Sequence, residues 1–244
     1  MGQKTVNNLF NDLTAALERD PRIDIHHYPL HIRLQDQHVS LEGKVENIAA
    51  KKAVLVQAKK LFGAKFVIDE LRVTPAEHKE DGALRDAVIN TLYHEPALSE
   101  FALRLNTNGE FSVIREASGD NNASQIDVRV ADGMVTLSGW VRSLTHKRLA
   151  EVLVWWTAGC ELVDNLLEVT PPEEDNDQEI TDAVRMIQEK DPFVHASQLA
   201  VNTRKGVVTL QGYVASKEEK KLAVLDAWYV SGVQDVVDLI QARS

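Results

Sequence analysis

The sequence is short of cysteine and of basic residues. Cys160 is its one cysteine, so no intrachain disulfide can form. The cysteine content therefore does not indicate whether the protein works in an oxidising or a reducing compartment. Lys and Arg together number 27 against 37 Asp and Glu, for a formal net charge of −10. Nucleic acids require basic surfaces, so this balance argues against a nucleic-acid partner, and it weighs against strong attraction to anionic membranes.

Long apolar runs are also lacking. No stretch is long and apolar enough to span a bilayer, so no transmembrane segment is predicted. The start of the chain lacks the apolar core that an export signal needs, and Val6 departs from the myristoylation pattern. From the residues alone we expect a cytoplasmic protein.

Motifs of catalysis and of closed metal sites are missing too. The sequence contains no phosphate-binding loop, nucleophile elbow or zincin motif, so we predict no enzymatic activity and no cofactor. Histidines cluster at His26, His27, His31 and His38. An extended backbone would place His27 and His31 on one face, but no Cys or carboxylate spacing completes a metal shell, and we predict surface or turn residues. Cys160 is predicted to be a small apolar filler.

The sequence instead repeats one cassette three times. The pattern Val-Ser/Thr-Leu-X-Gly-X-Val occupies residues 39–45, 135–141 and 208–214. Its glycines are Gly43, Gly139 and Gly212. Repetition of this kind indicates tandem copies of one structural unit. The alternating apolar residues predict a strand buried on one face, and the glycine at an inward position leaves room for another backbone or a helix.

A second helix is predicted after each cassette. Residues of good N-cap type lie four positions past the cassette glycines, at Asn47, Ser143 and Ser216. In the third copy Ser216 and Glu219 also fit a capping box. Further glycines lie where each helix would need a left-handed terminating residue, at Gly63, Gly159 and Gly232.

An amphipathic first helix is predicted upstream of each cassette. Each such helix should stop at an acidic residue followed by proline, at Asp20-Pro21, Glu95-Pro96 and Asp191-Pro192. A first strand follows the proline, and a closing strand with Asp or Asn near a Leu follows the second helix. The order of elements in each copy is therefore α-β-β-α-β.

This order predicts an α+β fold. Short turns should join the first two strands as an antiparallel hairpin, and the right-handed crossover rule makes the last strand a parallel neighbour. Each unit becomes a three-stranded mixed sheet with two helices packed on one face. The predicted units cover residues 5–75, 80–171 and 177–242, and packing between them is expected because units this small are marginal alone.

The second unit is longer than the others. An insertion at about residues 104–125 holds Asn108-Gly109 between two apolar segments, which predicts an extra hairpin. The polar run Ser118–Ser124 then predicts a loop. A functional insertion and a tolerated surface loop both remain open.

These residues resemble the BON domain family, named for bacterial osmotically inducible and nodulation proteins. The resemblance rests on the cassette, the second helix with its glycine, and the closing strand, and it covers nearly the whole chain as three copies. It implies a stress-associated binding module, often periplasmic, that engages phospholipid surfaces or envelope components through the first helices and the open sheet faces. The alternative is a cytoplasmic scaffold or a protein that senses a small ligand through surfaces between the copies.

The residues after the cassette glycines form the candidate interaction surface. Alternation points them away from the helices, onto the open sheet face, at Lys44, Trp140 and Tyr213. Packing against a neighbouring copy and contact with a partner or lipid are both open, since exposed apolar patches mark interaction sites.

Other side chains on the second helices are predicted to be structural. Core or inter-unit packing is expected for Trp155, Trp156 and Trp228. A solvated helix surface is expected for Lys51, Lys52, Lys59 and Lys60.

Overall fold

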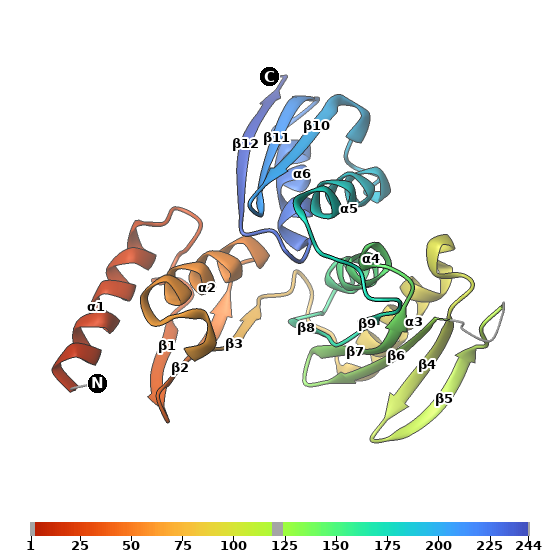
Figure 1. Cartoon of the computed structure of the whole chain (residues 1–244), viewed down its shortest axis with the longest axis horizontal. Helices are drawn as coiled ribbons and strands as arrows, with labels where there is room; N and C mark the ends of the chain where they lie inside the picture. The colour runs from red at the N-terminus through yellow and green to blue at the C-terminus, as the bar shows by residue number, and fades with distance from the viewer. Residues whose placement is uncertain (1–2, 119–123, 244) are drawn as a thin grey trace. The chain divides into compact units, whose positions relative to one another are not determined.

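A computed structural model describes residues 3–118 and 124–243 of the chain. It divides into two compact units, residues 1–74 and 75–244. The first unit holds one copy of the repeat, and the second unit holds the other two (Figure 1). We call these copies repeats 1, 2 and 3.

Repeat 1 is a three-stranded mixed sheet with two helices on one face. Its elements are α1 (Gln3–Arg19), β1 (Leu30–Gln35), β2 (His38–Val45), α2 (Ile48–Phe62), a 3-10 turn (Ala64–Phe66) and β3 (Val67–Val73). Strand β2 lies in the middle, antiparallel to β1 and parallel to β3. Leu13 and Leu17 of α1, Leu41 of β2, Val54 of α2 and Leu71 of β3 are fully buried and form the core.

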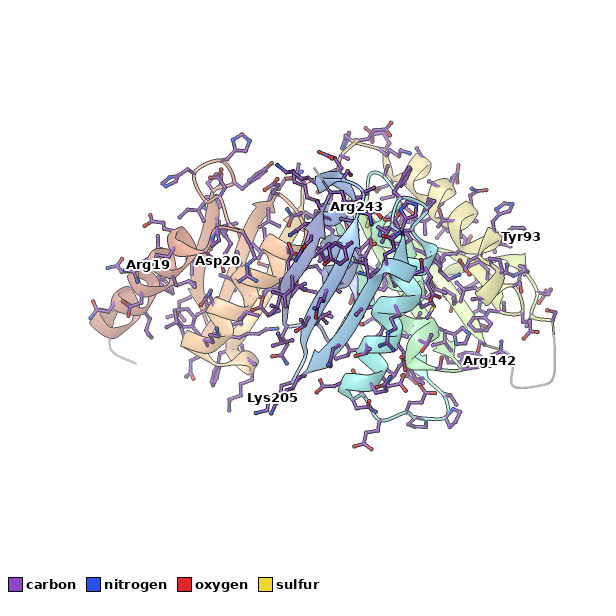
Figure 2. The ribbon with its side chains drawn as sticks, turned by 90° about the horizontal axis from the view of Figure 1, so that it is seen from above. Arg19, Asp20, Tyr93, Arg142, Lys205 and Arg243 are labelled. Carbon is purple, nitrogen blue, oxygen red and sulfur yellow. The ribbon has the colours of Figure 1, made fainter. Side chains whose placement is uncertain are left out.

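Repeat 3 has the same topology. Its elements are α5 (Asp177–Lys190), a 3-10 turn (Ala196–Gln198), β10 (Leu199–Arg204), β11 (Val207–Val214), α6 (Lys217–Tyr229) and β12 (Asp235–Ala242). The strand order is β10-β11-β12, with β12 parallel to β11. Lys205 and Arg243 mark opposite ends of this sheet (Figure 2). The predicted α-β-β-α-β order and mixed sheets are therefore confirmed.

Repeat 2 carries the predicted extra hairpin. Its elements are α3 (Asp81–His94), a 3-10 turn (Pro96–Leu98), β4 (Ala102–Thr107), β5 (Glu110–Arg115), β6 (Gln125–Ala131), β7 (Met134–Val141), α4 (Leu144–Trp155), β8 (Leu162–Asn165) and β9 (Glu168–Val169). Strand β4 pairs in parallel with β6, so the hairpin extends the sheet in the order β5-β4-β6-β7-β8, and β9 also pairs with β7. Most of the predicted loop Ser118–Ser124 lies outside the described residues.

A single arginine ties the added hairpin to the end of α3. The Arg115 guanidinium on β5 donates hydrogen bonds to the carbonyls of Phe101, Tyr93 and Leu98, at 2.9, 2.8 and 2.5 Å. It also lies 5.2 Å from the centre of the Tyr93 ring. These contacts fix the end of β5 next to the C-terminal end of α3 and the 3-10 turn that follows it.

Repeats 2 and 3 pack through their helices. Helix α4 contacts α5 and α6, and the rings of Trp155 and Tyr229 lie 6.3 Å apart (Figure 1). Arg148 of α4 is 2% exposed; its Nε donates to Ser231 O at 3.0 Å and its Nη2 to Asp175 Oδ1 at 2.7 Å. The helix-free faces of the two sheets therefore lie on the far side of this contact.

The second helices begin at the residues that the sequence marks. The side chains of Asn47, Ser143 and Ser216 accept hydrogen bonds from backbone N–H groups three residues on. The capping box predicted at Ser216 and Glu219 is only partly formed. The Glu219 N–H donates to Ser216 Oγ as predicted, but the Glu219 carboxylate does not return to the Ser216 N–H, so this part of the prediction was wrong. The buried carboxylate accepts the N–H of Ala215 and, in a loop before β10, the N–H and Nδ1 of His195, each at 2.8 Å.

The second glycines take up left-handed backbone in all three repeats, but only one of them ends its helix. Gly63 is the C-cap of α2, with its N–H bonded to Lys59 O. Helices α4 and α6 end earlier, at Trp155 and Tyr229, so Gly159 and Gly232 lie in the turns that follow. Gly232 is also closely packed, because a Cβ there would lie 3.1 Å from Ile180 Cδ1 and 3.2 Å from Arg148 Nη2.

The cassette glycine lies where two backbones approach most closely. Gly43, Gly139 and Gly212 face the strand that directly precedes the cassette strand, β1, β6 and β10 respectively, with φ of +133°, +109° and +144°. A Cβ at Gly212 would lie closer than 3.0 Å to Gln198 O, and a Cβ at Gly139 would lie closer than 3.0 Å to Gln125 O. A side chain would therefore force the hairpin strands apart.

We expect Gly212→Ala to destabilise the second unit by about 2–4 kcal/mol, because the substitution adds both a clash and an unfavourable φ. Urea unfolding of the full chain measures this change. The matched control is Gly82→Ala, at a helical glycine with nothing within 4 Å of its Cβ position. This control should be neutral or up to about 1 kcal/mol stabilising. Equal stability of Gly212→Ala and the parent protein would contradict the close-approach explanation.

Candidate binding surface

The residue after each cassette glycine lies on the helix-free face of its sheet. Glycine occupies an inward position, and side chains alternate along a strand, so the next residue points outward. Trp140 is 41% exposed, Tyr213 is 54% exposed and Lys44 is exposed as well. The three helix-free faces differ in chemistry around these residues.

In repeat 3 the face is apolar. Strand β12 pairs with β11 so that Val237 lies opposite Thr209 and Leu239 lies opposite Gln211, on the same face as Tyr213. Leu239 is 53% exposed and Val237 is exposed. Tyr213, Val237 and Leu239 form the apolar face of repeat 3.

In repeat 2 the face combines aromatic and ionic groups. The Arg104 guanidinium makes two hydrogen bonds to the Asp127 carboxylate, at 2.7 and 2.8 Å, and its carbon lies 4.5 Å from the centre of the Phe111 ring. Phe111 and Val113 of the added hairpin are exposed, and Trp140 lies opposite Gln125 in the same sheet. The insertion therefore adds apolar surface to this face.

In repeat 1 the face is charged. Arg33 donates to Glu42 at 3.0 Å, and Lys44 lies beside Arg72 of β3. Residues 1–74 contain 11 Lys and Arg against 9 Asp and Glu, whereas residues 75–244 contain 16 against 28. The net negative charge of the chain thus resides in the second unit.

Lys51 on the second helix of repeat 1 is buried, against the prediction of a solvated surface, whereas Lys59 and Lys60 are exposed as predicted. Lys51 Nζ lies 3.0 Å from Asp69 Oδ1 and also donates to Leu71 O. Burial lowers the pKa of Lys51, and the charge of Asp69 opposes this shift. Lys220 of repeat 3 makes the equivalent contacts, at 3.0 Å to Asp238 Oδ2 and 2.6 Å to Ile240 O.

These contacts explain why Asp or Asn recurs in the closing strand. Asp69 and Asp238 each accept the N–H of the residue two positions on, at 3.0 Å. In repeat 2, Asn165 takes the aspartate position and donates to Lys147 O and Glu151 Oε2, each at 3.0 Å. A lysine four residues after each N-cap was the available signal, and sequence reasoning missed it.

The histidines do not form a site. Residues 25–28 form turns held by Asp24 Oδ1, which accepts the N–H groups of His26 and His27, so the extended backbone assumed for His27 and His31 is absent. His38 lies at the other end of the hairpin, next to the β1–β2 turn. Among residues 3–118 and 124–243, no group of three or more His, Cys, Asp or Glu could hold a metal ion.

Two buried groups hold protons at neutral pH. Burial raises the pKa of Cys160 to about 12, so its thiol stays protonated. Asp226 of α6 is 2% exposed, and burial, with the neighbouring Asp191 carboxylate, raises its pKa to about 8. Repeat 1 has Gln57 at the aligned position, hydrogen-bonded to Asp20.

The BON domain model matches residues 6–75, 112–171 and 176–244, and the chain belongs to the BON domain family. The match to repeat 2 begins at Ser112, inside the added hairpin. No helix in the described part of the chain is long and apolar enough to cross a membrane.

The individual proteins that resemble this chain have low sequence identity to it. An uncharacterized protein in the gshII 5' region of Anaplasma centrale is 28% identical over 125 residues, which cover 49% of this chain and 83% of that protein. Two structures of CdsD, a structural protein of the type III secretion system of Chlamydia trachomatis, are 15% and 16% identical. One is its C-terminal domain. Their matches cover 97% of this chain and 98% and 94% of those chains, with TM-scores of 0.25 and 0.23. TM-scores this low support no inference about function.

Asp226→Asn should change how stability depends on pH. The pKa of Asp226 in the folded protein is about 8, above its ordinary value of 3.8. Between pH 3.8 and pH 8 the folded state therefore keeps a proton on Asp226 that the unfolded state has lost. The contribution of Asp226 to the free energy of unfolding is therefore greatest below pH 4 and is lost as the pH rises toward 8. Asparagine cannot ionise, so the variant should gain stability relative to the parent between pH 5 and pH 8.5.

Urea midpoints at these two pH values measure the effect. The control is Asp12→Asn, at an exposed position of α1, which should shift both midpoints equally or not at all. A parent–variant difference that stays constant from pH 5 to pH 8.5 would show that Asp226 is already ionised in the folded protein.

Proposed function

We propose that this chain is a non-enzymatic, stress-associated binding protein that engages envelope components, a phospholipid surface or a protein on it, through the helix-free sheet faces of repeats 2 and 3. The observation that carries the proposal is the apolar face of repeat 3, where Tyr213, Val237 and Leu239 are exposed side by side. Membership in a family of binding modules supports it.

The composition of this face fits a contact surface. An aromatic side chain with aliphatic neighbours and a polar rim is typical of interaction sites, because the apolar groups lose water on contact while the rim stays hydrated. Gln211 and Gln241 supply the neighbouring polar groups. Helix α4 of repeat 2 packs against α5 and α6 of repeat 3, so the helix-free sheet faces are not used in this packing and stay open to a partner.

The charge of the second unit decides which kind of lipid surface it could bind. The second unit is strongly acidic, so anionic headgroups should repel it, and any binding to vesicles through this unit should rest on apolar contact. Binding of this kind changes little with salt, unlike attraction between opposite charges. Zwitterionic vesicles are therefore the more suitable lipid partner for repeats 2 and 3.

A scaffold is the second candidate function. It is favoured by the packing of repeats 2 and 3 into one compact unit through buried Arg148, which holds two faces in a defined relation. Such a protein would hold two partners, or a small ligand, on surfaces of the repeats. It requires no lipid.

The double variant Tyr213→Ser, Leu239→Ser tests the proposed surface. Flotation of the full chain with zwitterionic and with anionic vesicles, at low and high salt, measures binding. Because two exposed apolar side chains are removed, at about 1–2 kcal/mol each, binding to zwitterionic vesicles should weaken by about thirtyfold or more.

Phe193→Ser is the matched control. Phe193 is 71% exposed but lies in the loop after α5 and not in a sheet, so its replacement removes exposed apolar area away from the proposed surface. If folded parent protein floats with neither vesicle type, the phospholipid form of the proposal fails. An equal loss in the control and the double variant would instead show that binding is not specific to the sheet face.

A further inference from the structure

Strand β10 leaves one side of the repeat 3 sheet unpaired within the described residues, because it lies at the end of the order β10-β11-β12 (Figure 1). Alternation turns the backbone groups of Leu199, Val201 and Thr203 toward this side. The Leu199 N–H bonds to Ala196 O, and Val201 O accepts a hydrogen bond from Arg185 Nη2 at 3.0 Å. An arginine of α5 therefore reaches to the sheet edge.

The same edge is occupied in repeat 2. The pairing of Ile126 with Gly139 and of Leu199 with Gly212 aligns β6 with β10. Strand β4 adds to β6 in parallel, with Leu103 opposite Ile126, and Ala102 N donates to Ser124 O at 2.9 Å. The chain itself thus shows that this edge accepts an extended segment, and in which direction.

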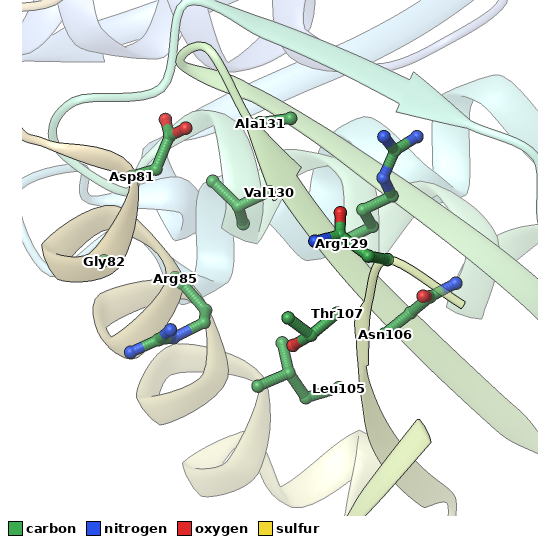
Figure 3. A pocket seen from close by; sticks show the side chains of 10 residues that line it. Asp81, Gly82, Arg85, Leu105, Asn106, Thr107, Arg129, Val130 and Ala131 are labelled. Atoms are coloured by element: carbon green, nitrogen blue, oxygen red, sulfur yellow. The ribbon is translucent and has the colours of Figure 1, made fainter. Parts of the chain in front are cut away.

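Cavities mark this position in both repeats. In repeat 2 a cavity of about 160 Å³ lies between the start of α3 and the ends of β4 and β6, and Leu105 and Thr107 of the added strand form part of its wall (Figure 3). In repeat 3 the cavity between α5 and β10 measures about 460 Å³, and its lining includes Arg185, Val201 and Thr203. In the described part of the chain, no added strand lies against the cavity of repeat 3.

The beginnings of α3 and α5 confirm that the two cavities are equivalent. Asp81 accepts the N–H groups of Asp132 and Gly133 in the β6–β7 turn, at 2.8 and 2.9 Å. Asp177 does the same for the β10–β11 turn, at 2.7 and 2.9 Å. Counted from these aspartates, Arg185 of repeat 3 stands where repeat 2 has Ile89.

We propose that the β10 edge binds an extended segment of a partner polypeptide, which adds to the sheet in parallel as β4 adds to β6. The charged groups at the groove are already engaged, Asp177 with the turn and Arg185 with Asp182 at 3.3 Å. Recognition therefore rests on main-chain hydrogen bonds, with small or aliphatic side chains at alternate positions. Arg185 closes the edge in the absence of a partner, as charged side chains do on other exposed edge strands.

This site uses neither the helix-free faces nor lipid, so it is independent of the proposed function. The double variant Tyr213→Ser, Leu239→Ser should bind the peptide below as the parent does. Loss of vesicle binding and loss of peptide binding can thus be told apart.

The test uses the full chain and a blocked synthetic peptide with the sequence of residues 101–107. Amide NMR should show shifts and slower hydrogen exchange at Val201 and Thr203 on titration. In β4 the N–H of Ala102 faces β6, and by alternation so does that of Arg104, whereas that of Leu105 faces β5. N-methylation at Arg104 should weaken binding about tenfold, the effect of one lost hydrogen bond, and N-methylation at Leu105 should not.

A protein variant gives a second readout. Arg185→Ile copies Ile89 of repeat 2 and removes the side chain that occupies Val201 O, so it should bind the unmodified peptide several-fold more tightly. Equal affinities of the two methylated peptides, or shifts that avoid Val201 and Thr203, would overturn the proposal. Protection of these amides that grows with protein concentration and without peptide would also overturn it, since the occupant would then be a second copy of the chain.

Discussion

The close approach of the cassette glycine to the strand before it is the constraint on which each repeat depends. At Gly139 and Gly212 the facing carbonyl leaves no space for a Cβ, and φ lies where side chains are disfavoured. The glycine thereby permits the hairpin register that the two-residue turn and the apolar pattern set. Register then decides which residues face the helices, which lie on the open face, and which backbone groups reach the sheet edge.

On this common frame the three repeats present different surfaces. Repeat 1 has an ionic face around Lys44, repeat 2 adds Phe111 and Val113 through its hairpin, and repeat 3 exposes Tyr213 beside Leu239. The edges differ as well, since β4 covers one of them and Arg185 reaches to another. The three repeats thus share a core arrangement and differ in the surfaces that they expose.

Local sequence signals predicted the helices, strands and turns, whereas the partners of buried polar side chains depended on the tertiary structure. The N-caps, the proline stops and the Asn108-Gly109 turn act within a few residues, so they could be predicted from sequence. The burial of Lys51 could not, because it depends on Asp69 and Leu71 of a strand that follows the helix. Glu219 was misassigned for the same reason: its partner His195 belongs to a loop before β10.

The sequence by itself determined the repeat, the α+β order, the mixed sheets and the family, because periodicity and short-range hydrogen bonding carry that information. Only the tertiary structure decided that α4 packs on α5 and α6, that Asp226 is buried beside Asp191, and that β4 joins the sheet beside β6. These features join segments far apart in the chain. Their free energy comes from desolvation and from contacts that exist only once the segments have come together.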